Sequence, residues 1–236
     1  MSGGLDAAAL LASMPSSAPD LGTAAVVALH PFAVPKRSVV ARLRQRGRTV
    51  APFADVVVDP ATGVSTVVPH GPGPAVASVT VELLAELGVR SIVTAGVAGW
   101  NDPTQIEPTS PSKLFAVDRA DGIDSLTSRY SEPPLRADPA LLAGAVGRCP
   151  GLRVERAHTT ATPLRTGDVD GPCLVEMEAA MIYAVASALG VAALSLVVVS
   201  DVRDRGGWRR RPDAEVADDV SLAASWARSI AAEAAS

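Results

Sequence analysis

Two glutamates in an otherwise apolar segment are the first residues of this sequence that could do chemistry. Glu176 and Glu178 lie in the run LVEMEAAMIY, residues 174–183. The pattern predicts a buried helix over residues 175–189, ended by Gly190. Residues two positions apart on a helix point about 200° away from each other, so the two carboxylates cannot both face one cavity. Either both lie in an exposed first turn, where negative charge suits the helix dipole, or one accepts hydrogen bonds from the hydroxyl groups of a ligand.

A serine and an aspartate at the end of a strand are the second candidate group. The apolar run over residues 193–199 predicts a buried strand, and Ser200 and Asp201 follow it directly. Ligands of open α/β sheets bind at the carboxyl ends of the strands, so Asp201 could act on a ligand there. A role as a turn residue or helix cap is the alternative interpretation.

Two glycines follow another buried strand, predicted over residues 91–95. Gly96 and Gly99 would let a ligand approach the backbone closely. They do not form the pattern G-x-G-x-x-G at the start of a helix, so a nucleotide-dependent oxidoreductase is disfavoured.

The elements that must position these residues indicate an α/β fold. Strands are predicted over residues 25–29, 55–58, 64–68, 91–95, 114–117, 153–160 and 193–199, and helices over 37–46, 75–87, 138–148, 175–189 and 221–235. Residues 55–58 and 64–68 read as a hairpin, and the order strand, helix, strand over residues 64–95 predicts a partly parallel sheet. We expect a single domain over residues 24–236, with a mixed central β-sheet flanked by helices, and a flexible N-terminal extension over residues 1–23.

The composition excludes several classes of partner. A chain of 236 residues with 48% hydrophobic residues can bury one sizeable core. Its net charge of -4 offers no broad basic surface, so no nucleic-acid partner is expected. The apolar stretch near the N-terminus is too short to span a membrane, which predicts a cytoplasmic protein. Cys149 and Cys173 have neither disulfide-framework nor zinc-site spacing, and neither a metal nor a cofactor is expected.

The order of these segments resembles the nucleoside phosphorylase superfamily, which includes purine nucleoside and uridine phosphorylases and the methylthioadenosine/adenosylhomocysteine nucleosidases. The resemblance covers roughly residues 24–235. It is carried by the Gly-x-x-Gly segment 96–99, the Ser-x-Tyr segment 128–130, the Glu-Met-Glu segment 176–178 and the Ser-Asp pair 200–201. The last two are the specific part, and positions 178 and 201 are 23 residues apart.

The resemblance implies a nucleoside substrate and cleavage of its N-glycosidic bond. That reaction builds positive charge on the sugar and negative charge on the departing base. Asp201 would protonate the base as a general acid, and Ser200, which precedes it in the motif, would help to bind the substrate. Glu178 would accept hydrogen bonds from the ribose 2′- and 3′-hydroxyls, Met177 would pack against the sugar, and Gly96 would line the substrate site.

The nucleophile stays open between inorganic phosphate and water. In the resemblance, Arg37 takes the place of an arginine that holds phosphate, although a solvated helix start explains it equally well. Thr94 and Val97 stand where phosphorylases have a second arginine and a hydroxyl residue, which favours water. His30 could then act as a base, with a structural role as the alternative.

Three further expectations complete the sequence analysis. The segment after Thr160 lacks the aromatic residue that commonly stacks on the base, so the alternative is a catalytically reduced homologue that binds a nucleoside or serves as a partner subunit. The arginines after the Ser-Asp pair, at 203, 205 and 209–211, either assist the acid or form a solvated loop. A homo-oligomer is expected because only 19% of the residues are charged, with contacts at residues 101–112 and at the hairpin of residues 55–68.

Overall fold

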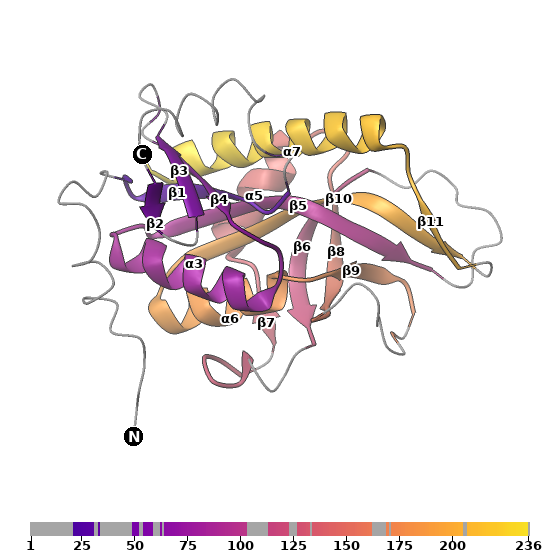
Figure 1. Ribbon diagram of the computed structural model, residues 1–236, viewed down its shortest axis with the longest axis horizontal. Coiled ribbons are helices and arrows are strands. Elements are labelled where there is room, and N and C mark those ends of the chain that lie inside the picture. Colours follow the sequence, from indigo (N-terminus) through magenta and orange to yellow (C-terminus); the bar gives the residue numbers. More distant parts are fainter. Residues whose placement is uncertain are drawn as a thin grey trace.

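The computed structural model describes residues 21–30, 33, 49–51, 54–58, 62, 64–102, 113–122, 127–132, 134–161, 169, 171–204 and 207–235. They form eleven strands and four helices (Figure 1). The strands are β1 (Ala24–Ala28), β2 (Thr49–Ala51), β3 (Ala54–Val58), β4 (Ser65–Pro69), β5 (Ser91–Asn101), β6 (Leu114–Asp121), β7 (Leu135–Arg136), β8 (Arg153–Thr159), β9 (Cys173–Glu176), β10 (Ala192–Asp204) and β11 (Gly207–Arg210). The helices are α3 (Pro74–Glu86), α5 (Pro139–Arg148), α6 (Ala179–Leu189) and α7 (Asp213–Ala234).

All the strands belong to one mixed sheet, as the sequence predicts. Its order is β11-β10-β6-β8-β9-β5-β1-β4-β3-β2, with β7 paired to β6. Strand β10 also pairs with β5, so β10, β6, β8, β9 and β5 close into a ring. Strand β5 lies at the junction, parallel to β1 and β10 and antiparallel to β9. The candidate residues on β5, β9 and β10 are therefore on strands that are hydrogen-bonded neighbours.

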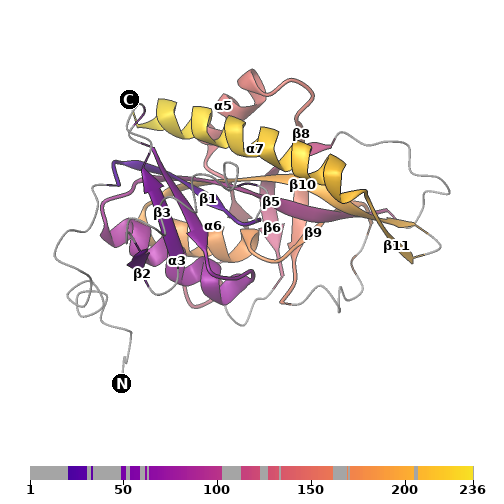
Figure 2. The ribbon, with the colours of Figure 1, turned by 45° about the horizontal axis from the view of Figure 1, so that its top comes forward.

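The helices cover the sheet in two layers. Helix α7 lies above the sheet, along β1, β5 and β10, with α5 beside it (Figures 1 and 2). Helices α3 and α6 pack together below it, and α6 contacts β6, β8 and β10. Helix α6 is apolar on every side and its residues 179–186 are buried, which accounts for its place inside the fold. No helix within these described ranges is both long and apolar enough to cross a membrane.

Most of the predicted elements are confirmed. The strand over residues 25–29 is β1, the hairpin is the antiparallel pair β3 and β4, and the strand over 153–160 is β8. Helix α3 is followed by Gly88 with φ +91, and α5 starts after Asp138, whose carboxylate accepts hydrogen bonds from the backbone N–H groups of residues 140 and 141. The predicted helix 37–46 lies outside the described residues. Of the predicted extension over residues 1–23 only residues 21–23 are described, and Leu21 is buried.

The prediction of a single helix over residues 175–189 is wrong. Residues 173–176 form β9, which pairs with β5 and β8, and the helix begins only at Ala179. A short apolar run fits a buried strand as well as a buried helix, and the pattern alone cannot separate the two. Residues 173–176 form a strand here because they hydrogen-bond to β5 on one side and to β8 on the other.

Candidate active site

Glu176 ends β9 and holds the start of α6. It is 5% exposed, so the alternative of an exposed first turn does not hold for this residue. Its Oε2 accepts the backbone N–H groups of Glu178 and Ala179, each at 2.7 Å, and its Oε1 accepts the hydroxyl of Thr159. Thr159 Oγ1 in turn accepts the N–H of Ala180 at 2.9 Å. Glu176 therefore caps the helix across the end of a strand, which is a structural task.

Glu178 lies between the N-termini of two helices. It is the N-cap residue of α6 and is 7% exposed, so the alternative of an exposed turn does not hold for it either. The N–H of Gly73, which precedes α3, donates to Glu178 Oε1 at 2.7 Å. Gly73 has φ +104, and a β-carbon added there would lie 3.7 Å from the Met177 side chain. The Glu178 carboxylate and the half-buried Met177 thus share the space beside Gly73.

The two glutamates do not carry their charges equally. The Glu176 carboxylate accepts three hydrogen bonds, which favours its ionised form although burial raises its pKa. Burial, and then the charge of Glu176, raise the pKa of Glu178 to about 7. We therefore take Glu176 as the ionised partner and Glu178 as the one that holds a proton near neutral pH.

Ser200 and Asp201 lie at an irregularity of β10. Val199 pairs with Ala98 and Asp201 with Gly99, so Ser200 is an extra residue opposite β5. Such a bulge turns consecutive side chains toward one side of a strand. The Ser200 hydroxyl accordingly lies 2.7 Å from Asp201 Oδ2, as its donor, and 3.4 Å from the carbonyl of Ala98. Both side chains are half-buried, which keeps the carboxylate accessible at the end of a buried strand.

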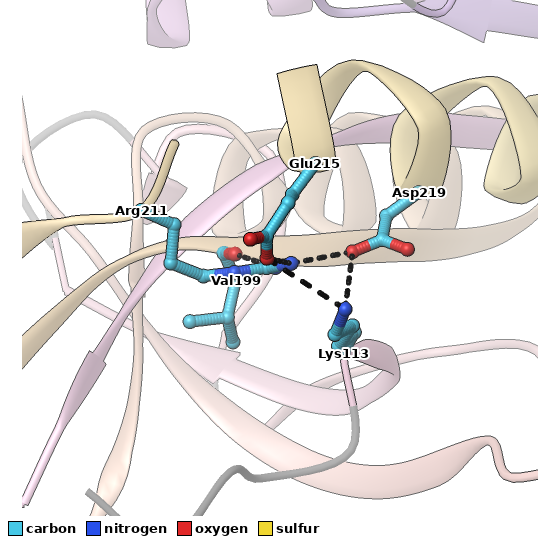
Figure 3. A network of polar contacts seen from close by, with 5 residues as sticks. All are labelled: Lys113, Val199, Arg211, Glu215 and Asp219. Atoms are coloured by element: carbon cyan, nitrogen blue, oxygen red, sulfur yellow. Dashed lines mark hydrogen bonds and ion pairs between the residues drawn. The ribbon is translucent and has the colours of Figure 1, made fainter. Parts of the chain in front are cut away.

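Arg211 connects Val199, the residue before this bulge, to helix α7 (Figure 3). Its backbone N–H donates to Ser200 O at 2.8 Å, and its Nη1 donates to Val199 O at 2.6 Å. Its Nη2 lies 2.6 Å from Asp219 Oδ2 and 3.4 Å from Glu215 Oε2, both on α7, and Lys113 approaches the same carboxylates. The guanidinium is thereby held against α7 while it holds the carbonyl of the residue before the bulge.

The register of three strands brings the two candidate groups to opposite sides of one glycine. Gly99 on β5 pairs with Val175 on β9 and with Asp201 on β10. Two strand spacings, about 10 Å in all, therefore separate the backbone at Val175 from that at Asp201. Glu178 follows three residues after Val175, just beyond the carboxyl end of β9. A small molecule that spans the distance between these strands could reach both carboxylates.

The two glycines of this segment also have packing roles. A β-carbon at Gly96 would lie 3.3 Å from Leu29 Cβ on the neighbouring chain segment after β1. A β-carbon at Gly99 would lie 2.5 Å from Cζ3 and 2.7 Å from Cη2 of Trp208, a contact that no side chain could tolerate without displacing the indole. Close approach of protein groups thus accounts for both glycines without any ligand.

The remaining predicted residues lie in different surroundings. Arg37 lies outside the described residues. Thr94 is fully buried, and its hydroxyl has no hydrogen-bond partner within the part of the chain that the structure describes. Burial, and then the charge of Arg210, lower the pKa of His30, which favours a neutral imidazole at the end of β1. The Tyr130 hydroxyl donates to Glu82 on α3 at 2.8 Å, so the Ser-x-Tyr segment is tied to that helix.

Three contributors to this arrangement were not identified from the sequence. Gly73 is signalled only by the Gly-Pro-Gly-Pro run before α3, which indicates a helix start but not a donor to Glu178. The basic run 209–211 left the role of its arginines open; Arg209 and Arg210 are exposed, whereas the Arg211 side chain is 15% exposed. Trp208 precedes that run, and no local signal connects it with Gly99.

With the geometry established, comparison with known families decides the assignment. The model of the family described as "Phosphorylase superfamily" matches residues 119–236, which is half of the chain. The chain belongs to the phosphorylase superfamily. The matched part contains β9, α6 and β10, and with them the Glu-Met-Glu and Ser-Asp segments. Comparison of the sequence with curated proteins gives no significant match.

Solved structures of the superfamily share the fold. Purine nucleoside phosphorylase from Toxoplasma gondii, in complex with immucillin-H, superposes with a TM-score of 0.63 at 16% identity, over 90% of this chain and 91% of that one. The methylthioadenosine/adenosylhomocysteine nucleosidase of Campylobacter jejuni gives 0.61 at 14% identity, over 90% and 99%. Uridine phosphorylase from Vibrio fischeri gives 0.61 at 14% identity, over 89% and 91%. At these identities the likeness establishes the superfamily fold alone.

Proposed function

We propose that this chain cleaves the N-glycosidic bond of a nucleoside. The observation that carries the proposal is that the strands leading to the Ser200–Asp201 pair and to Glu178 flank Gly99 on opposite sides. Cleavage of a nucleoside requires a proton donor for the departing base and hydrogen-bond acceptors for the sugar hydroxyls. Membership of the phosphorylase superfamily supports this reaction class.

Asp201 acts on the base. When the bond between the anomeric carbon and the base nitrogen breaks, its electron pair stays with the base, and a proton from the Asp201 carboxyl neutralises it. The bulge aims the carboxyl away from the strand, and the Ser200 hydroxyl at 2.7 Å restricts its rotation. General acid catalysis of this kind contributes about 10²- to 10⁴-fold to the rate.

Glu178 acts on the sugar. A carboxylate has about four acceptor sites, more than the backbone N–H groups of Gly73 and Met177 occupy. The 2′- and 3′-hydroxyls of ribose are the matching donors, and Met177 beside Gly73 provides an apolar contact for the ring. Because the ionised carboxylate is the stronger acceptor, ribose binding would favour loss of the proton that Glu178 holds near neutral pH.

The nucleophile that completes the reaction at the anomeric carbon is either water or inorganic phosphate. Hydrolysis gives the free sugar and phosphorolysis gives the sugar 1-phosphate. Base release should therefore be measured from purine and pyrimidine ribosides in a phosphate-free buffer and again with added phosphate. Release in both buffers assigns hydrolysis, and release only with phosphate assigns phosphorolysis. Absence of release in every case, from a folded protein, would contradict the proposed cleavage and leave nucleoside binding as the function.

A further inference from the structure

Trp208 is a large aromatic residue that stays partly exposed beside the candidate site. It lies on β11 and is 39% exposed, whereas Trp100 on β5 is 5% exposed and stacks on Phe115 with the ring centroids 5.6 Å apart. The Trp208 indole crosses β10 and ends on Gly99, where an added β-carbon would lie 2.5 Å from Cζ3. One part of the ring is thus fixed against the backbone of β5 and another part is open to solvent.

The register places the indole on the same face of the sheet as the Asp201 side chain. Asp201 pairs with Gly99 on one side and with Arg210 on the other, and residues that pair directly share a face. Trp208 is two residues from Arg210 along β11, so it shares that face as well. Its contact with Gly99 confirms the direction, because it brings the ring to the residue that pairs with Asp201.

We propose that Trp208 is the aromatic surface on which the planar base of the substrate stacks, next to the carboxyl of Asp201. This inference rests on the proposed function. Indole rings stack favourably on heteroaromatic rings of any base, and such contacts depend on a ring that is held in place and open on one side. Gly99 provides the hold, and the partial exposure of Trp208 provides the open surface.

The position of Trp208 also determines which part of the substrate it contacts. Asp201 would protonate the base, so a ring on the same face and one strand away lies nearer to the base than to the sugar. Glu178, which we assign to the sugar, lies on the other side of Gly99 beyond β9. Trp208 therefore recognises the base and leaves the sugar to Glu178.

Binding of free bases to the variants Trp208→Ala and Trp208→Phe tests the inference. Adenine, hypoxanthine and uracil would be titrated by calorimetry, with Trp226→Phe on α7 as the matched control and thermal unfolding as the check of folding. We expect Trp208→Ala to weaken the base that binds the wild type by about tenfold or more. Trp208→Phe keeps an aromatic ring and should stay within about threefold of the wild type, as should Trp226→Phe.

Other outcomes overturn the inference. Unchanged affinity in Trp208→Ala excludes stacking, and higher affinity means that the indole fills the space of the base instead. Failure of all three bases to bind the wild type also overturns it. The proposed cleavage is tested separately, by release of the base from nucleosides. Base binding that depends on Trp208 without such release would overturn the cleavage and support the stacking surface. Base release that does not depend on Trp208 would support the cleavage and overturn the stacking surface.

Discussion

The proton on Glu178 should make the stability of this protein fall as pH rises. Burial and the charge of Glu176 raise the pKa of Glu178 from its ordinary value of 4.5 to about 7 in the folded chain. Between these two values the folded state binds more protons than the unfolded state, so the free energy of unfolding decreases with increasing pH. At 1.36 kcal/mol per pKa unit, the ionisation of Glu178 lowers the free energy of unfolding by about 3 kcal/mol in total as the pH rises from below 4.5 to above 7.

The variant Glu178→Gln isolates this contribution from those of the other ionisable groups. Glutamine has the shape of the protonated acid and can still accept the Gly73 N–H, but it cannot ionise. Urea unfolding of both proteins should therefore give similar free energies at pH 5, and the variant should be the more stable by about 3 kcal/mol at pH 8.

The neighbouring Glu176 provides the control for this experiment. Glu176→Gln would turn an amide group toward three donors, so it should be less stable than the wild type at both pH values. If the wild type and Glu178→Gln differ by the same amount at pH 5 and pH 8, Glu178 does not hold a proton in the folded chain and the reasoning is refuted.

Three further predictions concern the bulge, the sugar site and the assembly. Arg211→Ala should lower the free energy of unfolding by about 2 to 3 kcal/mol and reduce turnover, because it removes charge-assisted hydrogen bonds to Val199 and Asp219. The exposed control Lys113→Ala should lower the free energy of unfolding by less than about 1 kcal/mol. Equal losses in the two variants would exclude a special role of Arg211. Glu178→Gln should raise the KM for ribosides without lowering Tm at neutral pH, whereas Glu176→Gln should lower Tm; a KM that stays at the wild-type value in Glu178→Gln counts against the sugar contact. Light scattering should report a mass at least twice the 24.1 kDa of the chain, and a clean monomer that turns over nucleosides would refute a shared site.

The sequence was sufficient for the elements whose patterns are local. The apolar runs over β1, β5 and β10 are long enough to predict strands, and Gly88 and Gly190 mark the ends of two helices correctly. The split of residues 173–189 into strand and helix depends on the edges of β5 and β8, which are distant in sequence. Local pattern cannot represent that competition, so the helix prediction failed there.

The candidate site was predictable as residues but not as an arrangement. The Glu-Met-Glu and Ser-Asp segments stand out by type and spacing. The bulge that turns Asp201 depends on the register between β10 and β5, and the contact of Trp208 with Gly99 joins residues more than 100 positions apart. These features arise from tertiary pairing, which leaves no periodic signal in either segment.

Base release by the variant Asp201→Asn is the most direct test of the proposed reaction. Asparagine keeps the size of the side chain and its contact with Ser200 but has no acidic proton to give to the base. Release of the base from the best nucleoside substrate should be measured for the wild type and the variant, with matching thermal unfolding curves as proof of folding. The proposal predicts a rate lower by at least about tenfold in the variant. An unchanged rate would remove Asp201 from the mechanism and contradict the account of this site.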